Sequence, residues 1–381
     1  MAALDGEAGS GEGRVSTCDL SPSGSNLDGG PPLDARENLP RFRHAPRVVD
    51  DLVARDPDEV LSELLFGFLG TQLLYVVAEL GIADLIDEEP KAVEVLAARA
   101  EAVPDILYRF LRALASLGVF AEVQERVFAH TESSLLLRRE SGSGWHEFAL
   151  VYGSVYRAFA EAVPAARSGE NMFERASGSG WWEWLAARPE LGAAFNRAMQ
   201  AAAQGRIAAL KNFPWDEVET VVDVGGGNGT LIIGLLEQHA HLRGVIFDLP
   251  QVAPAASARI AHASLDGRCS VEAGSFFERV PQGGDVYLLA KILHDWDDAA
   301  ALEILRRVRA SATAETRLLV LDSVITSETN SQRTKLLDLV LLALVNGRER
   351  TADEWRHLLD RGGWLVTSIE NGLIEAQAAS R

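Results

Sequence analysis

The stretch VVDVGGGNGTLIIGLLEQHAHLRGVIFDL, residues 221–249, decides the fold of this chain. Its first four residues form a short apolar strand, and a glycine-rich turn follows them. The apolar pattern then predicts a helix over 231–238 and a second strand over 244–249. Two strands joined through a helix lie parallel in one sheet, so the stretch predicts a strand–turn–helix–strand unit of an α/β protein.

The same alternation of strand and helix continues toward the C-terminus. It predicts strands over 270–273, 285–290 and 318–324, and helices over 252–262, 298–310 and 351–361. Residues 364–366 and 373–376 predict antiparallel edge strands. We therefore expect residues 214–381 to form a catalytic α/β domain, with a doubly wound, mostly parallel, Rossmann-like sheet covered by helices on both faces.

The residues before 214 predict a helical domain, which we expect over 46–213. Residues 58–86 carry apolar side chains nearly all round a helix, which is typical of a subunit interface or of an ordinary core helix. Residues 91–130 follow the order helix, turn, helix, hairpin, a winged-helix-like pattern. Residues 145–213 are rich in aromatic side chains, which a pocket for a planar ligand needs and which core packing also explains.

Composition and charge exclude several classes of protein. The chain has 381 residues, with 36 basic and 55 acidic side chains and a net charge of −19, which opposes binding to nucleic acid or to an anionic membrane. No run of about 18 consecutive apolar residues predicts a transmembrane helix. Residues 1–45 are rich in Gly, Ser, Pro and Asp, and we expect a disordered tail there without a signal peptide. Two cysteines form no disulfide framework, so we expect a cytoplasmic protein.

The glycine turn predicts a nucleoside cofactor. The spacing of Asp223, Gly225, Gly227 and Gly229 is DxGxGxG, and Thr230 stands where a dinucleotide fingerprint requires its third glycine. A carboxylate beside the turn repels a pyrophosphate but suits a cofactor with an ammonium and a sulfonium. Asp248 closes the next strand, where an acid can accept both ribose hydroxyls. The alternative is a glycine turn near a surface aspartate.

A histidine follows the strand 285–290. The segment KILHDWDD, residues 291–298, places His294 where strand ends of an open α/β sheet face the ligand crevice. A lone histidine is more often structural than catalytic, but this one has carboxylates around it in sequence.

With these segments the chain resembles the S-adenosylmethionine-dependent O-methyltransferases of the caffeic acid type, including bacterial natural-product members. The resemblance covers about 58–376. It rests on these motifs: VVDVGGGNG at 221–229, FDLP at 247–250, AGSFF at 273–277, LHDWDD at 293–298, LLVLDSVI at 318–325 and NGRERTADEW at 346–355.

The resemblance implies a role for each matching residue. His294 is expected to be the general base, oriented by Asp322 and Glu349. The cofactor is expected to be S-adenosyl-L-methionine, with these candidate ligands: Asp223, Gly225, Gly227, Asp248, Leu249, Ser275, Phe276 and Lys291. The candidate residues for the methyl acceptor are Met199, Trp145, Tyr152, Asp338 and Leu339. The chain is expected to form a homodimer through its N-terminal helices, and no clustered ligand set implies a metal.

Three positions depart from the family pattern. Ser275 replaces an aspartate before the phenylalanine that contacts adenine, which leaves a neutral partner there. Asp322 replaces a glutamate beside the histidine, which shortens its reach by about 1.5 Å, roughly one carbon–carbon bond. Ala290 stands four residues before the histidine, where many members have a polar residue, often lysine. Lys291 is one place off and is expected to face away.

The leading hypothesis is methyl transfer to a phenolic hydroxyl of a small aromatic natural product. The alternatives are methylation at nitrogen or carbon, or a relative that uses the cofactor for hydroxylation or decarboxylation. A DNA-binding regulator that uses the winged helix is a further alternative, which the net charge disfavours. We expect a small aromatic substrate as partner, and neither nucleic acid nor membrane.

Overall fold

The computed structural model describes residues 56–326 and 332–379. The expected tail, residues 1–45, lies outside the described residues. The helical part begins with α2 (Pro57–Glu79) and α3 (Ile82–Leu85). Helices α4 (Val93–Arg99) and α5 (Pro104–Ser116) follow, together with a three-stranded sheet formed by these described strands: β1 (Lys91–Ala92), β2 (Phe120–Gln124) and β3 (Val127–His130). The predicted winged-helix-like order is therefore present, although the part is not purely helical.

Helix α5 shows why the sequence folds this way locally. Pro104 occupies its first turn, where a missing N–H costs nothing. Its apolar residues recur at helical spacing and pack into one core: Leu107, Leu111 and Leu114. Gly118 follows the helix with φ +78°, a conformation that favours glycine and stops the helix.

The second helical segment leads toward the sheet. Its elements are α6 (Glu132–Leu136), η1 (Arg139–Ser141), α7 (Trp145–Val155), η2 (Tyr156–Glu161), α8 (Ala162–Ser168), α9 (Met172–Ser177), α10 (Trp181–Ala186) and α11 (Pro189–Ala209). Phe173 lies edge-on to Trp181 and Trp184, with ring centroids 5.2 and 5.3 Å apart. Phe173 and Trp181 are buried, so core packing accounts for part of the aromatic content.

A sheet of seven described strands follows, in the order β11-β12-β8-β7-β4-β5-β6. Its strands are β4 (Thr220–Val224), β5 (Arg243–Asp248), β6 (Cys269–Ala273), β7 (Val286–Ala290), β8 (Arg317–Leu321), β11 (Trp364–Glu370) and β12 (Leu373–Ala378). Strands β6, β5, β4, β7 and β8 pair in parallel, while β12 and β11 are antiparallel. This order confirms the predicted doubly wound, mostly parallel sheet.

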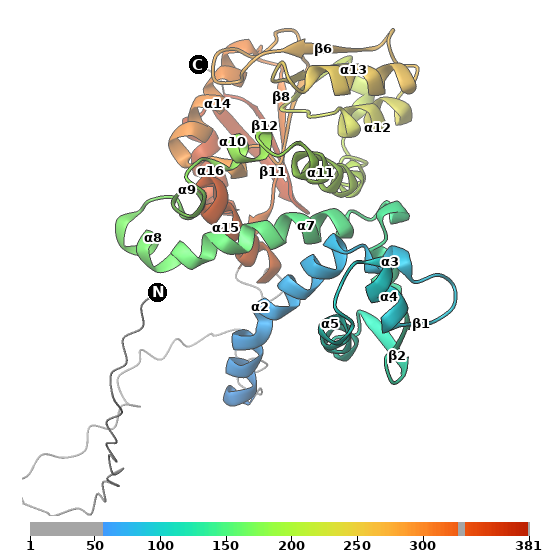
Figure 1. The fold of residues 1–381 in the computed structure, drawn as a ribbon. Helices are drawn as coiled ribbons and strands as arrows, with labels where there is room; N and C mark the ends of the chain where they lie inside the picture. The colour runs from blue at the N-terminus through green and yellow to red at the C-terminus, as the bar shows by residue number, and fades with distance from the viewer. Residues whose placement is uncertain (1–55, 327–331, 380–381) are drawn as a thin grey trace, which may run out of the picture. The chain divides into compact units, whose positions relative to one another are not determined.

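Helices cover both faces of the sheet and bury a core on each. Helices α12 (Thr230–Gln238) and α13 (Ala253–His262) lie on one face, and α14 (Asp298–Ser311) and α16 (Ala352–Arg361) lie on the other (Figure 1). Ile232 and Ile260 belong to the first core, and Leu305 and Trp355 to the second. Helix α15 (Gln332–Val345) packs instead against α9 of the helical part.

Two predictions about the strands are wrong. The expected strand 318–324 ends at Leu321, and β9 (Val324–Ile325) is a separate piece that pairs with β10 (Arg350–Thr351). The backbone N–H of Asp322 donates to the carbonyl of Gly372 at 3.1 Å, after which the chain leaves the sheet. Strand β12 is interior rather than an edge strand, because it pairs with both β8 and β11.

Candidate active site

The candidate residues gather where the parallel strands end. Asp223 lies near the end of β4, and Asp248 is the last residue of β5. Lys291 and Asp322 follow directly after β7 and β8. The carboxyl ends of neighbouring parallel strands meet at one edge of the sheet, where ligands of open α/β folds bind.

The glycine turn is fixed by its neighbours. Gly225 and Gly227 have φ values of +74° and +58°, which only glycine adopts readily. The N–H of Gly227 donates to Oδ2 of Asp248 at 2.7 Å, and the N–H of Leu249 donates to its Oδ1 at 2.7 Å. A Cβ atom on Gly226 would lie 2.8 Å from Cγ of Asp223. The Asp248 carboxylate therefore holds the glycine turn in shape through its two backbone hydrogen bonds.

Asp223 is buried and incompletely paired. Its Oδ2 has no hydrogen-bond partner among the described residues. Burial, reinforced by the negative charge of Asp248, raises the pKa of Asp223 from 3.8 to about 7. The half-buried Arg206 of α11 opposes this rise, and burial lowers its own pKa. Nothing in the sequence indicates Arg206 as a site residue, because its position on a long helix carries no motif.

Ser275 and Phe276 lie at the same edge. The Ser275 hydroxyl accepts the N–H of Phe277 at 3.3 Å, so it stabilises its own turn. The ring of Phe276 comes within 3.7 Å of the position that a Cβ on Gly225 would take. Leu249 is exposed. The structure therefore brings Phe276 to the glycine turn.

His294 lies in η4 (Leu293–Asp295) and is buried. Its Nδ1 lies 3.1 Å from Oε1 of Glu349, within hydrogen-bond distance. Oδ1 of Asp322 is 3.8 Å from the same nitrogen, too far for a hydrogen bond, as its short side chain predicts. Oδ1 of Asp295 lies 3.5 Å from Nε2. Glu349 therefore fixes a proton on Nδ1 and leaves Nε2 as the acceptor nitrogen.

The surrounding carboxylates control the charge of His294. Burial by itself lowers the pKa of the imidazole, but Asp322, Glu349 and Asp295 outweigh burial and raise it. Burial raises the pKa of Asp295 to about 6 and raises that of Asp322. Burial opposes ionisation of Glu349 too, yet its bond to His294 and the charge of Lys291 lower its pKa.

Lys291 points into this cluster, and the expectation that it faces away is wrong. Its Nζ donates to the hydroxyl of Ser323 at 2.8 Å and lies 3.6 Å from Oε1 of Glu349. Strand β7 ends at Ala290, and Lys291 has φ +59°. The alternation of side chains along a strand therefore stops before Lys291, which is why the sequence pattern gave the wrong direction.

The loop that holds His294 and Glu349 is tightly built. The N–H of Glu349 donates to Oδ1 of Asp338 at 2.7 Å, so this α15 residue supports Glu349. The buried guanidinium of Arg350 donates to the carbonyl of Leu293 and to Oδ1 of Asp298. A Cβ on Gly347 would lie 2.2 Å from the carbonyl oxygen of His294. Only glycine allows the two segments to approach this closely.

The other acceptor candidates form a second group. Trp145 and Tyr152 lie on α7, joined through Phe148, whose ring centroid lies 6.0 Å from Trp145 and 6.3 Å from Tyr152. The Arg333 guanidinium lies 6.0 Å from the Trp145 ring centroid. Burial raises the pKa of Tyr152, and Arg333 opposes that rise. Two further candidates differ in burial: Met199 is half-buried on α11, and Leu339 is exposed on α15.

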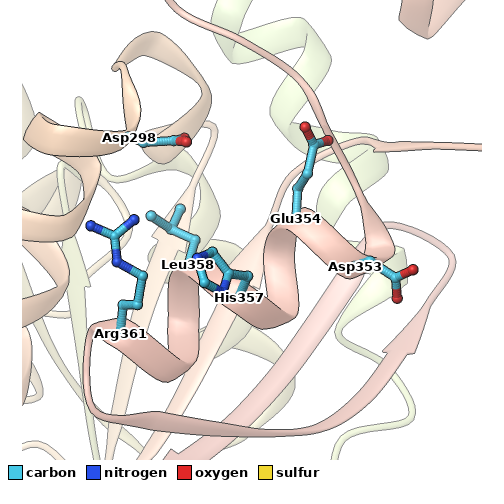
Figure 2. Close-up of a pocket in the computed structure, with 6 residues that line it drawn as sticks. All are labelled: Asp298, Asp353, Glu354, His357, Leu358 and Arg361. Atoms are coloured by element: carbon cyan, nitrogen blue, oxygen red, sulfur yellow. The ribbon is translucent and has the colours of Figure 1, made fainter.

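Two surface hollows lie elsewhere. One, of about 280 Å³, is formed by α16 and Asp298 (Figure 2). His294 does not line it, and its Asp298 already pairs with Arg348 and Arg350. The other, of about 580 Å³, lies between α2 and α5. Across residues 56–326 and 332–379, no three His, Cys, Asp or Glu side chains are arranged to hold a metal ion.

Comparison with known proteins identifies the family. Residues 156–365 match the O-methyltransferase domain, and residues 62–139 match the O-methyltransferase dimerisation domain. Phenazine O-methyltransferase PhzM of Lysobacter antibioticus is 38% identical over 312 residues, 81% of this chain and 92% of that protein. The 8-amino-8-demethylriboflavin N,N-dimethyltransferase of Streptomyces davaonensis is 34% identical over 304 residues, 78% of this chain and 87% of that protein.

A solved structure shares the fold. The O-methyltransferase NcsB1 from neocarzinostatin biosynthesis, in complex with S-adenosylmethionine and 2-hydroxy-5-methyl naphthoic acid, has a TM-score of 0.73 at 30% identity. The match covers 81% of this chain and 96% of that one. The chain therefore belongs to the S-adenosylmethionine-dependent O-methyltransferases of the caffeic acid type.

Proposed function

We propose that this enzyme transfers a methyl group from S-adenosylmethionine to a phenolic hydroxyl of a small aromatic natural product, with His294 as general base. One observation carries the proposal. His294 is buried at the strand ends with Nδ1 bonded to Glu349, so Nε2, with Oδ1 of Asp295 3.5 Å away, is the nitrogen left to accept a proton. Membership of the family indicates methyl transfer. The position of His294 favours a hydroxyl as the acceptor, because a hydroxyl loses its proton when it is methylated and a base must accept that proton.

The residues at the glycine turn fit the cofactor. The unpartnered Oδ2 of the buried Asp223 suits the ammonium at its methionine end. A Cβ on Gly227 would meet nothing within 4 Å, so the backbone there leaves room for close approach. Asp248 ends β5 where it would accept the ribose hydroxyls, and Phe276 would contact the adenine. Bound S-adenosylmethionine supplies an activated methyl group on its sulfonium.

The chain's task is then to orient and deprotonate the acceptor. A phenol has a pKa of about 10, by analogy with tyrosine, so about one molecule in a thousand is ionised at neutral pH. Nε2 of His294 takes the proton while Nδ1–H donates to Glu349. The negative charges of Glu349 and Asp322 stabilise the imidazolium that forms. Such general-base help contributes about 10²–10⁴-fold to the rate.

A screen with methyl-labelled S-adenosylmethionine tests this function. The enzyme is incubated with a panel of phenols, aromatic amines and hydroxylated naphthoic acids, and products are identified by mass spectrometry and NMR. We expect the label on oxygen of a phenolic acceptor. Label only on nitrogen or carbon would overturn the proposal in favour of the activity named for the riboflavin relative. Oxidised or decarboxylated products without label would favour a non-methylating reaction.

Asp248 gives a prediction about cofactor binding. In the wild type, the N–H groups of Gly227 and Leu249 each donate to one oxygen of the Asp248 carboxylate. In Asp248→Asn an amide NH₂ group replaces one of these oxygens and cannot accept a hydrogen bond, so one of the two N–H groups loses its partner. We expect the dissociation constant of S-adenosylhomocysteine to rise about tenfold or more, the effect of losing one charge-assisted hydrogen bond. Isothermal titration calorimetry measures it. Asp266→Asn, at an exposed aspartate beyond α13, is the control and should bind normally; equal affinity in both variants would reject the role of Asp248.

We propose that the enzyme is a homodimer formed through α2. By length and composition alone, this helix could cross a membrane, although it contains no uninterrupted run of about 18 apolar residues. Only 6% of its most apolar 18-residue segment is buried in the protomer. The matched dimerisation domain includes most of α2, which gives this surface a protein partner. The apolar groove between α2 and α5, lined by Leu69, Leu73, Ile106 and Phe110, adds to the same face. Because a second subunit, and not a membrane, would cover the apolar face of α2, we also propose a cytoplasmic enzyme.

The double variant Leu64→Asp/Leu65→Asp tests this assembly. Both side chains are 72% exposed in the protomer, so burying two charges at an interface would separate the subunits. Light scattering after size exclusion should give a dimer for the wild type and a monomer for the variant. Leu365→Asp, at an exposed leucine of β11, should remain dimeric. A wild-type protein that is monomeric at micromolar concentration would contradict the proposal.

A further inference from the structure

Lys291 is a cation inside the carboxylate cluster around His294. Its side chain is 23% exposed, and its Nζ is held at 2.8 Å by the hydroxyl of Ser323. The same Nζ lies 3.6 Å from Oε1 of Glu349 and 3.7 Å from Oδ1 of Asp322. Oε1 of Glu349 also accepts from His294, so one carboxylate oxygen lies between the imidazole and the ammonium.

The backbone fixes the lysine in this position. Its φ of +59° lies in the left-handed region, which is uncommon for a residue other than glycine. Its N–H donates to the carbonyl of Leu321 at 3.0 Å, which anchors it beside the end of β8. The Ser323 hydroxyl, which accepts from Lys291, also lowers the pKa of Glu349, so serine, lysine and glutamate influence one another within one cluster. The side chain is therefore held toward His294 from both its backbone and its tip.

The charges that face His294 come from every element around it. The negative ones are Asp295 in η4, Asp322 after β8 and Glu349 before β10, and together they favour the protonated imidazole. Lys291 after β7 opposes them. Arg350 and Arg206 also carry positive charge toward the cluster, where both act on Asp322. Arg350 is occupied by Asp298 and by backbone carbonyls, so Lys291 is the cation that acts directly on both Glu349 and His294.

We propose that Lys291 is a positioning residue for His294: its ammonium, held by Ser323 between Asp322 and Glu349, offsets part of their negative charge and so favours the neutral, proton-accepting form of the imidazole. This proposal rests on the proposed function only for its consequence, since a neutral imidazole matters to a general base. The effect of the Lys291 charge on the protonation of His294 does not depend on whether the enzyme turns over a substrate.

The test compares two substitutions that differ in charge. Lys291→Met keeps the length of the side chain and removes its charge, and Lys291→Arg keeps the charge. The protonation of His294 is followed by NMR of histidine-labelled, full-length enzyme saturated with S-adenosylhomocysteine. The His294 resonance is the one that disappears in His294→Gln. We expect the titration midpoint to rise by about one pH unit in Lys291→Met, the size of a nearby-charge effect, and to stay near the wild-type value in Lys291→Arg.

A purely structural role would give a different result. An unchanged midpoint in Lys291→Met, or the same shift in Lys291→Arg, would overturn the proposal. Should Lys291→Met not fold, Ser323→Ala provides the second test, because it releases the ammonium while the backbone contacts of Ser323 remain; it should raise the midpoint by a smaller amount, and no shift would count against the proposal. The measurement needs no acceptor, so its failure is distinct from failure of the methyl-transfer proposal, which a product screen decides.

Discussion

Replacing His294 by glutamine is expected to lower kcat by about 10²–10⁴-fold, the usual contribution of a general base. Glutamine can still donate a hydrogen bond to Glu349 but cannot take a proton from a phenol. Rates are measured with the acceptor that the labelled screen identifies. The affinity for S-adenosylhomocysteine should stay within about twofold, because the hydrogen bond and ion pairs of His294 within the described residues go to Glu349, Asp322 and Asp295 and not to the glycine turn.

Two comparisons make the His294 result specific. His357→Gln, at an exposed histidine of α16, should keep the wild-type rate. The wild-type rate should fall as the pH drops through the pKa of His294, which the surrounding carboxylates raise, since only the neutral imidazole accepts a proton. Near-normal turnover by His294→Gln on a phenol would remove His294 from the proposed mechanism.

Replacing Asp223 by asparagine is expected to stabilise the cofactor-free protein at pH 8 by about 2–4 kcal/mol. The pKa of this carboxyl is about 7 in the folded protein and about 3.8 when exposed. Between these values the folded state holds a proton that the unfolded state has released. The free energy of unfolding therefore decreases as the pH rises from about 4 to about 7, and the full cost is present above 7. Asparagine has no such cost.

Urea unfolding at one protein concentration, at pH 5 and pH 8, measures this effect. The wild type should lose stability relative to Asp223→Asn as the pH increases, and Asp266→Asn should follow the wild type. The affinity for S-adenosylhomocysteine should change in the opposite sense, because the ammonium loses its carboxylate partner. A variant that is less stable than the wild type at pH 8 would show that Asp223 is not an unfavourable buried charge.

The sequence predicted the elements that depend on local pattern. The glycine turn, the strand before it, the helix after it and most other strand positions follow from apolar periodicity and from glycine positions, and the structure has them within a few residues. The direction of Lys291 and the break after Leu321 did not follow, because they depend on a left-handed backbone and on a hydrogen bond to Gly372, which no local pattern records. Arg206 and Asp295 were missed for a related reason: their significance comes from burial beside other charges.

The contacts of His294 and those of Trp145 come from different parts of the chain. Among the described residues, the imidazole forms its hydrogen bond and ion pairs with Asp295, Asp322 and Glu349, whereas the aromatic side chains of α7 meet one another and Arg333. A substitution on α7 consequently alters no contact of the proton-accepting group. Because the acceptor candidates Trp145 and Tyr152 lie on α7, we expect substitutions on this helix to change which acceptor is bound while the hydrogen bond of His294 to Glu349 stays as it is.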